Sequence, residues 1–195
     1  MKRFLDIILS FLGILCLLPF GVILTALVVS GSKGPVFYKQ QRVGRGNKDF
    51  GLLKFRSMKT GSDKKGLLTV GNTDSRITKT GGFLRKYKLD ELPQLINVLL
   101  GEMSLVGPRP EVRKYVDMYS DEQLKVLSVR PGITDYASLE YIDEDAVLGA
   151  AEDAEKTYIT TIMPAKLILN LKYVKEQNVW VDIKLILATL AKIAK

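Results

Sequence analysis

The chain of 195 residues contains no histidine and a single cysteine, Cys16. One cysteine cannot form a disulfide within the chain. Zinc sites are built from clusters of Cys and His, and Ser-His or Cys-His nucleophile pairs need an imidazole base, so both kinds of site are excluded. Any catalysis therefore depends on carboxylate, Lys, Arg or Tyr side chains, with or without a hard cation.

Acidic residues are fewer than basic ones, with 21 Asp and Glu against 29 Lys and Arg, so the formal net charge is +8. This balance favours a polyanionic partner: nucleic acid, anionic lipid or a phosphorylated substrate. The aromatic residues are not interleaved with the basic ones, as a stacking surface for single strands requires. We therefore expect no nucleic-acid partner, although a non-enzymatic, membrane-anchored basic module stays an alternative to an enzyme.

Charge is almost absent from one long segment, Phe4 to Ser30, where Asp6 is the only charged residue. As a straight helix this segment would be about 40 Å long, against a hydrocarbon core of about 30 Å. A cleaved signal peptide is a poorer explanation, because the run exceeds the usual apolar region and no small-residue cleavage site follows it. The segment is predicted to be a membrane helix.

The topology of this helix is ambiguous in the sequence. Lys2 and Arg3 precede it and further basic residues follow it, so the positive-inside rule draws both ends to the cytoplasm. Pro19 lies near the middle, where its missing N–H bends a helix. A re-entrant helix and a kinked single span both satisfy these signals. Arg3 and Asp6 are one turn apart and are expected to pair in either case.

The rest of the chain predicts an α+β fold that is mostly helical. Two β-prone runs, VFYKQQRV and DFGLLKFRSM, are joined by a Gly-rich turn and predict a hairpin. Gly101 ends a predicted helix from Pro93 to Leu100, and Ser120 with Gln123 resembles a capping box. The other expected elements are a polar loop at 60–76, helices around 83–87, 111–119 and 120–128, a turn at 129–134, an acidic stretch at 140–155 and amphipathic interfacial helices at 164–195.

One stretch, RKYKLDELPQ, sets two adjacent carboxylates, Asp90 and Glu91, directly behind the cations Arg85, Lys86 and Lys88. At the start of a helix, the positive end of the dipole and nearby cations are expected to lower the pKa of Asp90 and keep it ionised. An ionised carboxylate can attack phosphorus without a general base. Nucleophilic catalysis is therefore open to a chain without histidine.

Such a reaction brings two anions together, so cations must neutralise the phosphate oxygens. Arginine suits this role because its planar fork grips phosphate bidentately, although each lone Arg is as well explained by a surface charge. A Mg²⁺ ion held by one or two carboxylates, here Asp90 and Glu91, is the usual companion of a diphosphate. The candidate phosphate ligands are Lys54, Arg56, Arg85, Arg109 and Arg130.

Five motifs occur in one order within residues 1–134: KRFLD, GPVFYKQQRVG, LLKFRSM, RITKTGGFLRKYKLDELPQLINVLLGEMSLVGPRP and VRPGIT. Together they resemble the monotopic phosphoglycosyl transferases, small enzymes that begin lipid-linked glycan assembly in bacteria. The resemblance implies transfer of a sugar phosphate from a UDP-sugar to a polyprenyl phosphate, with release of UMP and a requirement for Mg²⁺. It also implies that Asp90 forms a covalent phosphosugar intermediate, that Glu91 assists it and that both position Mg²⁺, while Arg109 holds the nucleotide.

The same resemblance implies how the chain meets the membrane. Residues 1–32 are expected to form a re-entrant helix with both ends cytoplasmic and a break around Leu18 and Pro19. Residues 33–195 are expected to form a catalytic domain on the cytoplasmic face of the inner membrane, with its C-terminal amphipathic helices against anionic headgroups.

The chain also departs from the family pattern. After PGIT it continues with DYAS, beginning at Asp135, where many relatives have Gly and then Trp-Ala-Gln. Residues 140–163 have no recognisable counterpart, so the identity of the sugar stays open. The chain lacks the extra transmembrane helices and appended domain of larger relatives, and is expected to be the minimal catalytic form.

Overall fold

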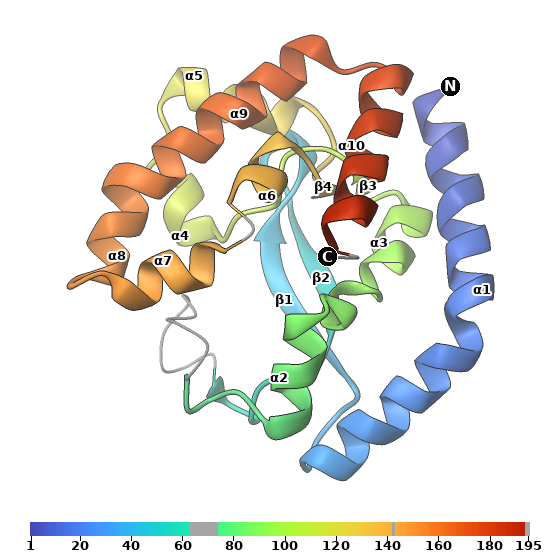
Figure 1. The fold of residues 1–195 in the computed structure, drawn as a ribbon. Helices are drawn as coiled ribbons and strands as arrows, with labels where there is room; N and C mark the ends of the chain where they lie inside the picture. The colour runs from blue at the N-terminus through green and yellow to red at the C-terminus, as the bar shows by residue number, and fades with distance from the viewer. Residues whose placement is uncertain (63–73, 142, 194–195) are drawn as a thin grey trace.

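The computed structural model describes residues 1–62, 74–141 and 143–193 (Figure 1). They form mostly helices with two small sheets, which confirms the expected α+β class in this coarse form. Most of the polar loop expected at 60–76 lies outside the described residues. The helices are α1 (Lys2–Gly31), α2 (Lys79–Lys86), α3 (Gln94–Leu100), α4 (Arg113–Val116), α5 (Asp121–Leu124), α6 (Tyr136–Glu140), α7 (Glu144–Ala150), α8 (Ala154–Thr157), α9 (Met163–Glu176) and α10 (Val179–Ile193). The strands are β1 (Phe37–Val43), β2 (Asp49–Phe55), β3 (Ser104–Val106) and β4 (Gly132–Thr134).

The first sheet is the hairpin that the sequence predicts. Strands β1 and β2 pair antiparallel, with Phe37 opposite Phe55. In the turn, Gly46 and Asn47 have φ angles of 69° and 60°. This left-handed backbone is easy for Gly and tolerated by Asn, which explains the composition of the turn. The second strand carries Lys54 toward the acid pair.

The second sheet was not expected. Strands β3 and β4 pair in parallel, with Ser104 opposite Gly132 and Val106 opposite Thr134. The sequence predicted a turn at 129–134, and this is wrong because residues 132–134 are a strand. Strands of three residues are too short to show an alternating pattern. The pairing brings two segments of the chain together beside the acid pair.

Two glycines allow this sheet to form. A Cβ atom on Gly132 would lie 2.0 Å from the backbone nitrogen of Gly107. We expect Gly132→Ala to destabilise the protein by at least about 2 kcal/mol, because backbone on both sides must move. Thermal unfolding measures this effect. Gly82→Ala in α2 is the control: its Cβ would have no neighbour closer than 4.0 Å, so an unchanged or raised Tm is expected there.

Helix α1 runs unbroken from Lys2 to Gly31, with Pro19 inside it. The predicted break around Leu18 and Pro19 is therefore wrong. Figure 1 shows instead that α1 bends part of the way along its length. A proline removes one backbone hydrogen bond and tilts the helix axis, and the bonds on either side can continue the helix through the bend.

The N-terminal end of α1 is bonded to the rest of the protein. The ammonium group of Lys2 donates to Asp182 Oδ2 at 2.7 Å, to the Val106 carbonyl at 2.9 Å and to the Tyr173 hydroxyl at 3.0 Å. The Tyr173 hydroxyl in turn donates to Asp182 Oδ1 at 2.7 Å. This network ties the start of α1 to β3, α9 and α10.

Arg3 and Asp6 do not pair with each other, contrary to expectation. The Arg3 guanidinium donates to two carbonyls at the C-terminal end of α3, at 2.6 and 3.0 Å. Asp6 is buried and accepts from the Ser104 hydroxyl and the Leu105 backbone N–H, both at 3.0 Å. Both charged side chains therefore help to dock α1, because each one bonds polar groups of α3 or β3.

The C-terminal end of α1 is held as well. Arg56 is buried, and its Nη2 donates to the carbonyl of Val28 in the last turn of the helix and to the carbonyl of Ser32 just after it. Leu24 and Val28 pack with Leu84 of α2 in one apolar cluster. Helix α1 thus contacts the remainder of the protein at both ends.

The opposite face of α1 is apolar and exposed. Its most apolar window has a mean hydropathy of 2.8, with 11% of that window buried. By length and composition, α1 is the one helix among the described residues that could cross a membrane. Because α1 packs along the rest of the structure, the predicted domain boundary at 32/33 stays a prediction.

The C-terminal half is helical, as predicted, but in shorter pieces than expected. Helices α4 and α5 have four residues each, and the capping box of Ser120 and Gln123 is confirmed. Helices α9 and α10 confirm the predicted tail helices. One side of α10 leaves apolar side chains exposed, and their contact with lipid stays a prediction: Trp180, Ile183, Leu187 and Leu190.

Candidate active site

The acid pair lies in a 3₁₀ turn, Leu89–Glu91, between α2 and α3. It stands just before the N-terminus of α3, as predicted. Lys88, immediately before the turn, has a left-handed backbone with φ 55°. This conformation is costly for a residue with a Cβ and occurs often at functional sites. The turn directs the two carboxylates into different surroundings.

Glu91 is held by two cations. Arg109 grips it with both arms, Nη1 donating to Oε2 at 3.1 Å and Nη2 donating to Oε1. Lys54 of β2 donates to Oε1 at 3.2 Å. A bidentate guanidinium bond is strong and directional. Both oxygens of Glu91 are thus occupied, and the carboxylate fixes the position of the Arg109 side chain.

Asp90 has a different environment. It is 6% exposed, and no group in residues 1–62, 74–141 and 143–193 donates a hydrogen bond to its carboxylate. The charges of Lys54, Arg85 and Lys88 act on it over longer distances. A partly desolvated carboxylate without hydrogen bonds keeps its lone pairs available for an incoming electrophile.

These surroundings separate the two acids electrostatically. Burial raises the pKa of Asp90, and the neighbouring charge of Glu91 adds to this, outweighing Lys54, Arg85 and Lys88. Burial also opposes ionisation of Glu91, but Arg109 and Lys54 hold the pKa of Glu91 well below its usual range. The expected lowering of the Asp90 pKa is therefore wrong: burial exceeds the effect of the cations.

Arg109 is positioned by a residue that sequence reasoning missed. Asp135 is fully buried, accepts from the Arg109 backbone N–H at 3.3 Å and caps α6 by accepting from the Ser138 N–H at 2.6 Å. Burial raises the pKa of Asp135. An Asp three residues before a Ser at the start of a helix is an N-cap signal that could have indicated this role.

Two of the predicted phosphate ligands lie elsewhere. Arg56 bonds the last turn of α1, as described above. Arg130 donates from Nε to the Gly101 carbonyl at 2.9 Å, beside Arg3 and Arg45, whose charges add to burial in lowering the Arg130 pKa. The structure therefore gathers Lys54, Arg85 and Arg109 around the acid pair and engages the other two arginines at helix ends.

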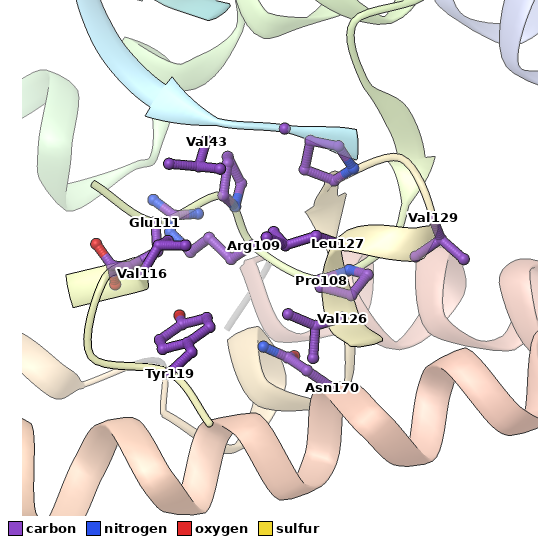
Figure 2. Close-up of a pocket in the computed structure, with 13 residues that line it drawn as sticks. Val43, Pro108, Arg109, Glu111, Val116, Tyr119, Val126, Leu127, Val129 and Asn170 are labelled. Carbon is purple, nitrogen blue, oxygen red and sulfur yellow. The ribbon is translucent and has the colours of Figure 1, made fainter. Parts of the chain in front are cut away.

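Figure 2 shows a pocket beside the loop that carries Arg109, whose side chain is one of those that line it. Its walls are mostly apolar, with Tyr119 and Asn170 facing it. The Oδ1 atom of Asn170 is buried and has no hydrogen-bond partner among the described residues. Asp90 and Glu91 do not line this pocket. The acid pair, and not the pocket, is therefore the candidate reaction centre.

The acid pair suits a hard divalent cation such as Mg²⁺. Within the described residues no cluster of three or more Asp, Glu, Cys or His side chains forms. Mg²⁺ commonly needs only one or two carboxylates, because water and substrate phosphates complete its shell. Asp90 would be the principal ligand and Glu91 a shared one, since its oxygens already accept from Arg109 and Lys54.

Comparison with known proteins shows the family of the chain. Residues 1–195 match the model of a family described as bacterial sugar transferase. Over 195 residues the chain is 37% identical to a UDP-N-acetylgalactosamine-undecaprenyl-phosphate N-acetylgalactosaminephosphotransferase of Aeromonas hydrophila, covering 98% of this chain and 43% of that protein. Over the same length it is 36% identical to a UDP-glucose:undecaprenyl-phosphate glucose-1-phosphate transferase of Escherichia coli (strain K12), covering 98% and 40%.

A third similar protein is shorter. The uncharacterized sugar transferase EpsL of Bacillus subtilis (strain 168) is 43% identical over 140 residues, which cover 71% of this chain and 68% of that protein. The chain spans about two fifths of the length of the first two relatives.

Proposed function

The chain belongs to the bacterial sugar transferase family, and from this premise we propose that it transfers a sugar 1-phosphate from a UDP-sugar to a polyprenyl phosphate, releasing UMP. The names of the Aeromonas and Escherichia proteins describe this kind of reaction for those relatives. One observation of the chain itself carries the proposal: Asp90 is a buried carboxylate with no hydrogen bonds among the described residues, beside an acid that two cations hold ionised.

In the first half-reaction, a carboxylate oxygen of Asp90 bonds to the phosphorus that carries the sugar. The bond from this phosphorus to the oxygen that bridges the diphosphate breaks, and UMP leaves with the bonding electrons. Arg109 and Lys54, which both bond Glu91, are the cations expected to compensate the charge that develops on the phosphates. Mg²⁺ bound at Asp90 and Glu91 would supply further charge neutralisation on the diphosphate.

In the second half-reaction, a phosphate oxygen of the polyprenyl phosphate bonds to the same phosphorus. The bond to Asp90 breaks and the carboxylate is released unchanged, so the product is a polyprenyl diphosphate sugar. With a second pKa of about 6, a phosphate monoester is largely a dianion at pH 7. Neither half-reaction then needs a general base, which agrees with a chain that has no histidine.

The experiment that tests this function offers the purified protein a panel of UDP-sugars with Mg²⁺ and undecaprenyl phosphate. We expect one or a few of them to give equal amounts of UMP and lipid-linked sugar phosphate. Sugar-specific release of UDP in place of UMP would contradict the proposal, because it would mean that the bond between the sugar carbon and the phosphate oxygen is the one that breaks.

The acid limb of the pH profile follows from the raised pKa of Asp90. Attack needs the carboxylate, so kcat/KM should fall as the pH drops through a value above the ordinary 3.8. Lys54 lowers the Asp90 pKa, so Lys54→Met should move this limb to higher pH. Lys156→Met, an exposed lysine of α8, is the control. An acid limb that does not move in Lys54→Met would assign the titration to another group.

We further propose that α1 lies within one leaflet as a re-entrant helix, with the catalytic part on the cytoplasmic face. Lys2 at one end and Val28 at the other both bond to the same folded unit, and a straight span would carry these ends to opposite sides of the membrane. The bend, the exposed apolar face and the basic flanks support the same arrangement.

Cysteine labelling tests this topology. In a Cys16→Ala background, a cysteine inserted after Met1 and a cysteine at position 48 should both react from the cytoplasmic side of inverted vesicles. Insertion after Met1 keeps Lys2 and its network intact. Labelling of the two sites from opposite sides would show a true span and remove the re-entrant proposal.

A further inference from the structure

Helix α2 presents an exposed face beside the acid pair. The exposed positions recur at helical spacing, and the opposite side is buried through Gly81 and Leu84. Phe83 is 49% exposed and Tyr87 is 46% exposed, and their rings contact each other with centroids 5.1 Å apart. The Lys86 ammonium lies 5.4 Å from the centre of the Tyr87 ring. The two rings in contact form a small exposed apolar patch with a cation beside it.

This face continues directly to the reaction centre. Tyr87 caps the C-terminal end of α2, and Lys88 follows as an exposed residue. The charge of Lys88 acts on both Asp90 and Glu91. The part of the chain that the structure describes offers the Lys88 ammonium no hydrogen-bond or ion-pair partner. A free cation thus stands between the aromatic pair and the acids.

Helix α2 also packs against the apolar helix α1. Leu84, on the buried side of α2, packs with Leu24 and Val28 of α1, and Figure 1 shows α2 beside this half of α1. In the same half, Val22 and Ile23 are exposed. Helix α2, which carries the aromatic pair, therefore lies beside the half of α1 that exposes apolar side chains, and Tyr87 precedes Asp90 by three residues.

We propose that this surface, formed by Phe83, Lys86, Tyr87 and Lys88, binds the acceptor polyprenyl phosphate during the second half-reaction. The isoprenoid chain crosses the two aromatic rings toward α1, and Lys86 and Lys88 hold the phosphate beside Asp90. The inference rests on the proposed function. The surface and the acceptor are chemically complementary. The acceptor has a long apolar chain and a dianionic head, and the surface has two aromatic rings and two cations.

Measuring the two half-reactions separately distinguishes the role of this surface from that of the acid pair. The double variant Phe83→Ala/Tyr87→Ala should form UMP without acceptor at a rate and amplitude within about twofold of the parent protein. Its KM for undecaprenyl phosphate should rise about tenfold, as loss of about 1.4 kcal/mol of aromatic contact implies. Lys88→Gln should raise the same KM. Tyr87→Phe keeps the ring and should behave like the parent.

Two matched variants control for exposed apolar area and for charge. Met118→Ala removes an exposed apolar side chain near α4, and Lys156→Gln removes an exposed cation on α8. Both should leave the acceptor KM unchanged. Flotation of each variant with vesicles of phosphatidylglycerol and phosphatidylethanolamine measures membrane binding separately from catalysis, and it should be equal for all of them.

The possible results are distinguishable. Normal UMP formation with an unchanged acceptor KM in the aromatic variant would overturn the acceptor surface and leave the transferase proposal standing. Equal loss in both half-reactions, or loss of vesicle binding, would assign the aromatic pair to folding, membrane anchoring or a protein partner and also overturn it. Absence of UMP formation by the parent protein with every UDP-sugar would overturn the proposed function and this inference together.

Discussion

Replacing Asp90 with Asn is expected to lower turnover by at least about 10⁴-fold, as removal of a nucleophile does in enzymes that form covalent intermediates. The amide has nearly the same shape but cannot attack phosphorus. The measurement is UMP release with UDP-sugar, Mg²⁺ and acceptor. Asp90→Glu is the companion variant: it keeps the charge and displaces the oxygens, so a loss of about 10² is expected.

Asp90→Asn should not destabilise the fold. Asp90 accepts no hydrogen bond from the described residues, and burial raises its pKa above that of the unfolded chain. A carboxyl with a raised native pKa favours the native state at low pH and opposes it as the pH rises through that pKa. Asp90→Asn should therefore match or exceed the parent Tm at pH 7, and this difference should shrink toward pH 4.

The opposite pattern would be informative. An inactive Asp90→Asn protein with a Tm far below the parent would indicate a structural role. A folded variant with near-normal turnover would remove Asp90 from the reaction.

Arg109→Met is expected to produce the second large effect, in both activity and stability. Among the described residues Glu91 would keep Lys54 alone as a partner, and the developing phosphate charge would lose the guanidinium beside it, so kcat/KM should fall about 10²- to 10³-fold. Breaking a buried ion pair costs about 3 to 5 kcal/mol, and the 34% exposure of the Arg109 side chain reduces this to about 2 kcal/mol.

Arg113→Met is the matched control for this variant. Arg113 pairs with Asp49 at 2.6 Å, and both side chains are substantially exposed, so little change in Tm or kcat/KM is expected. Arg109→Lys should recover part of the stability and little of the activity, because an ammonium group cannot grip Glu91 at two points. A kcat/KM in Arg109→Met within a few-fold of the parent would show that Glu91 and the nucleotide do not depend on the guanidinium.

Local signals predicted much of the fold. The hairpin follows from two β-prone runs and a turn with Gly46 and Asn47, and α3 from an apolar stripe that ends at Gly101. The parallel pair of β3 and β4 could not be predicted in this way, because each strand has three residues and the partners are distant in sequence. The bend of α1 was indicated by Pro19, but its continuity through that residue depends on hydrogen bonds that composition does not report.

The sequence predicted which residues lie together at the candidate site better than it predicted their pKa shifts. The charge pattern identified Asp90 and Glu91, and the structure brings Lys54 and Arg109 to Glu91. The sign of the Asp90 pKa shift was wrong because burial, which dominates, is a property of the assembled fold. Arg56 illustrates the same limit: an arginine predicted as a phosphate ligand bonds the end of α1, and only the packing of α1 distinguishes the two roles.

The most direct test of the account is the mass of the protein after incubation with a UDP-sugar that it uses and Mg²⁺, without a lipid acceptor. A buried carboxylate that itself captures phosphorus must gain the mass of one sugar phosphate, less the elements of water, on the peptide that contains Asp90, and must lose it when undecaprenyl phosphate is added. Steady UMP formation by a protein whose Asp90 peptide never carries this additional mass would contradict the covalent route.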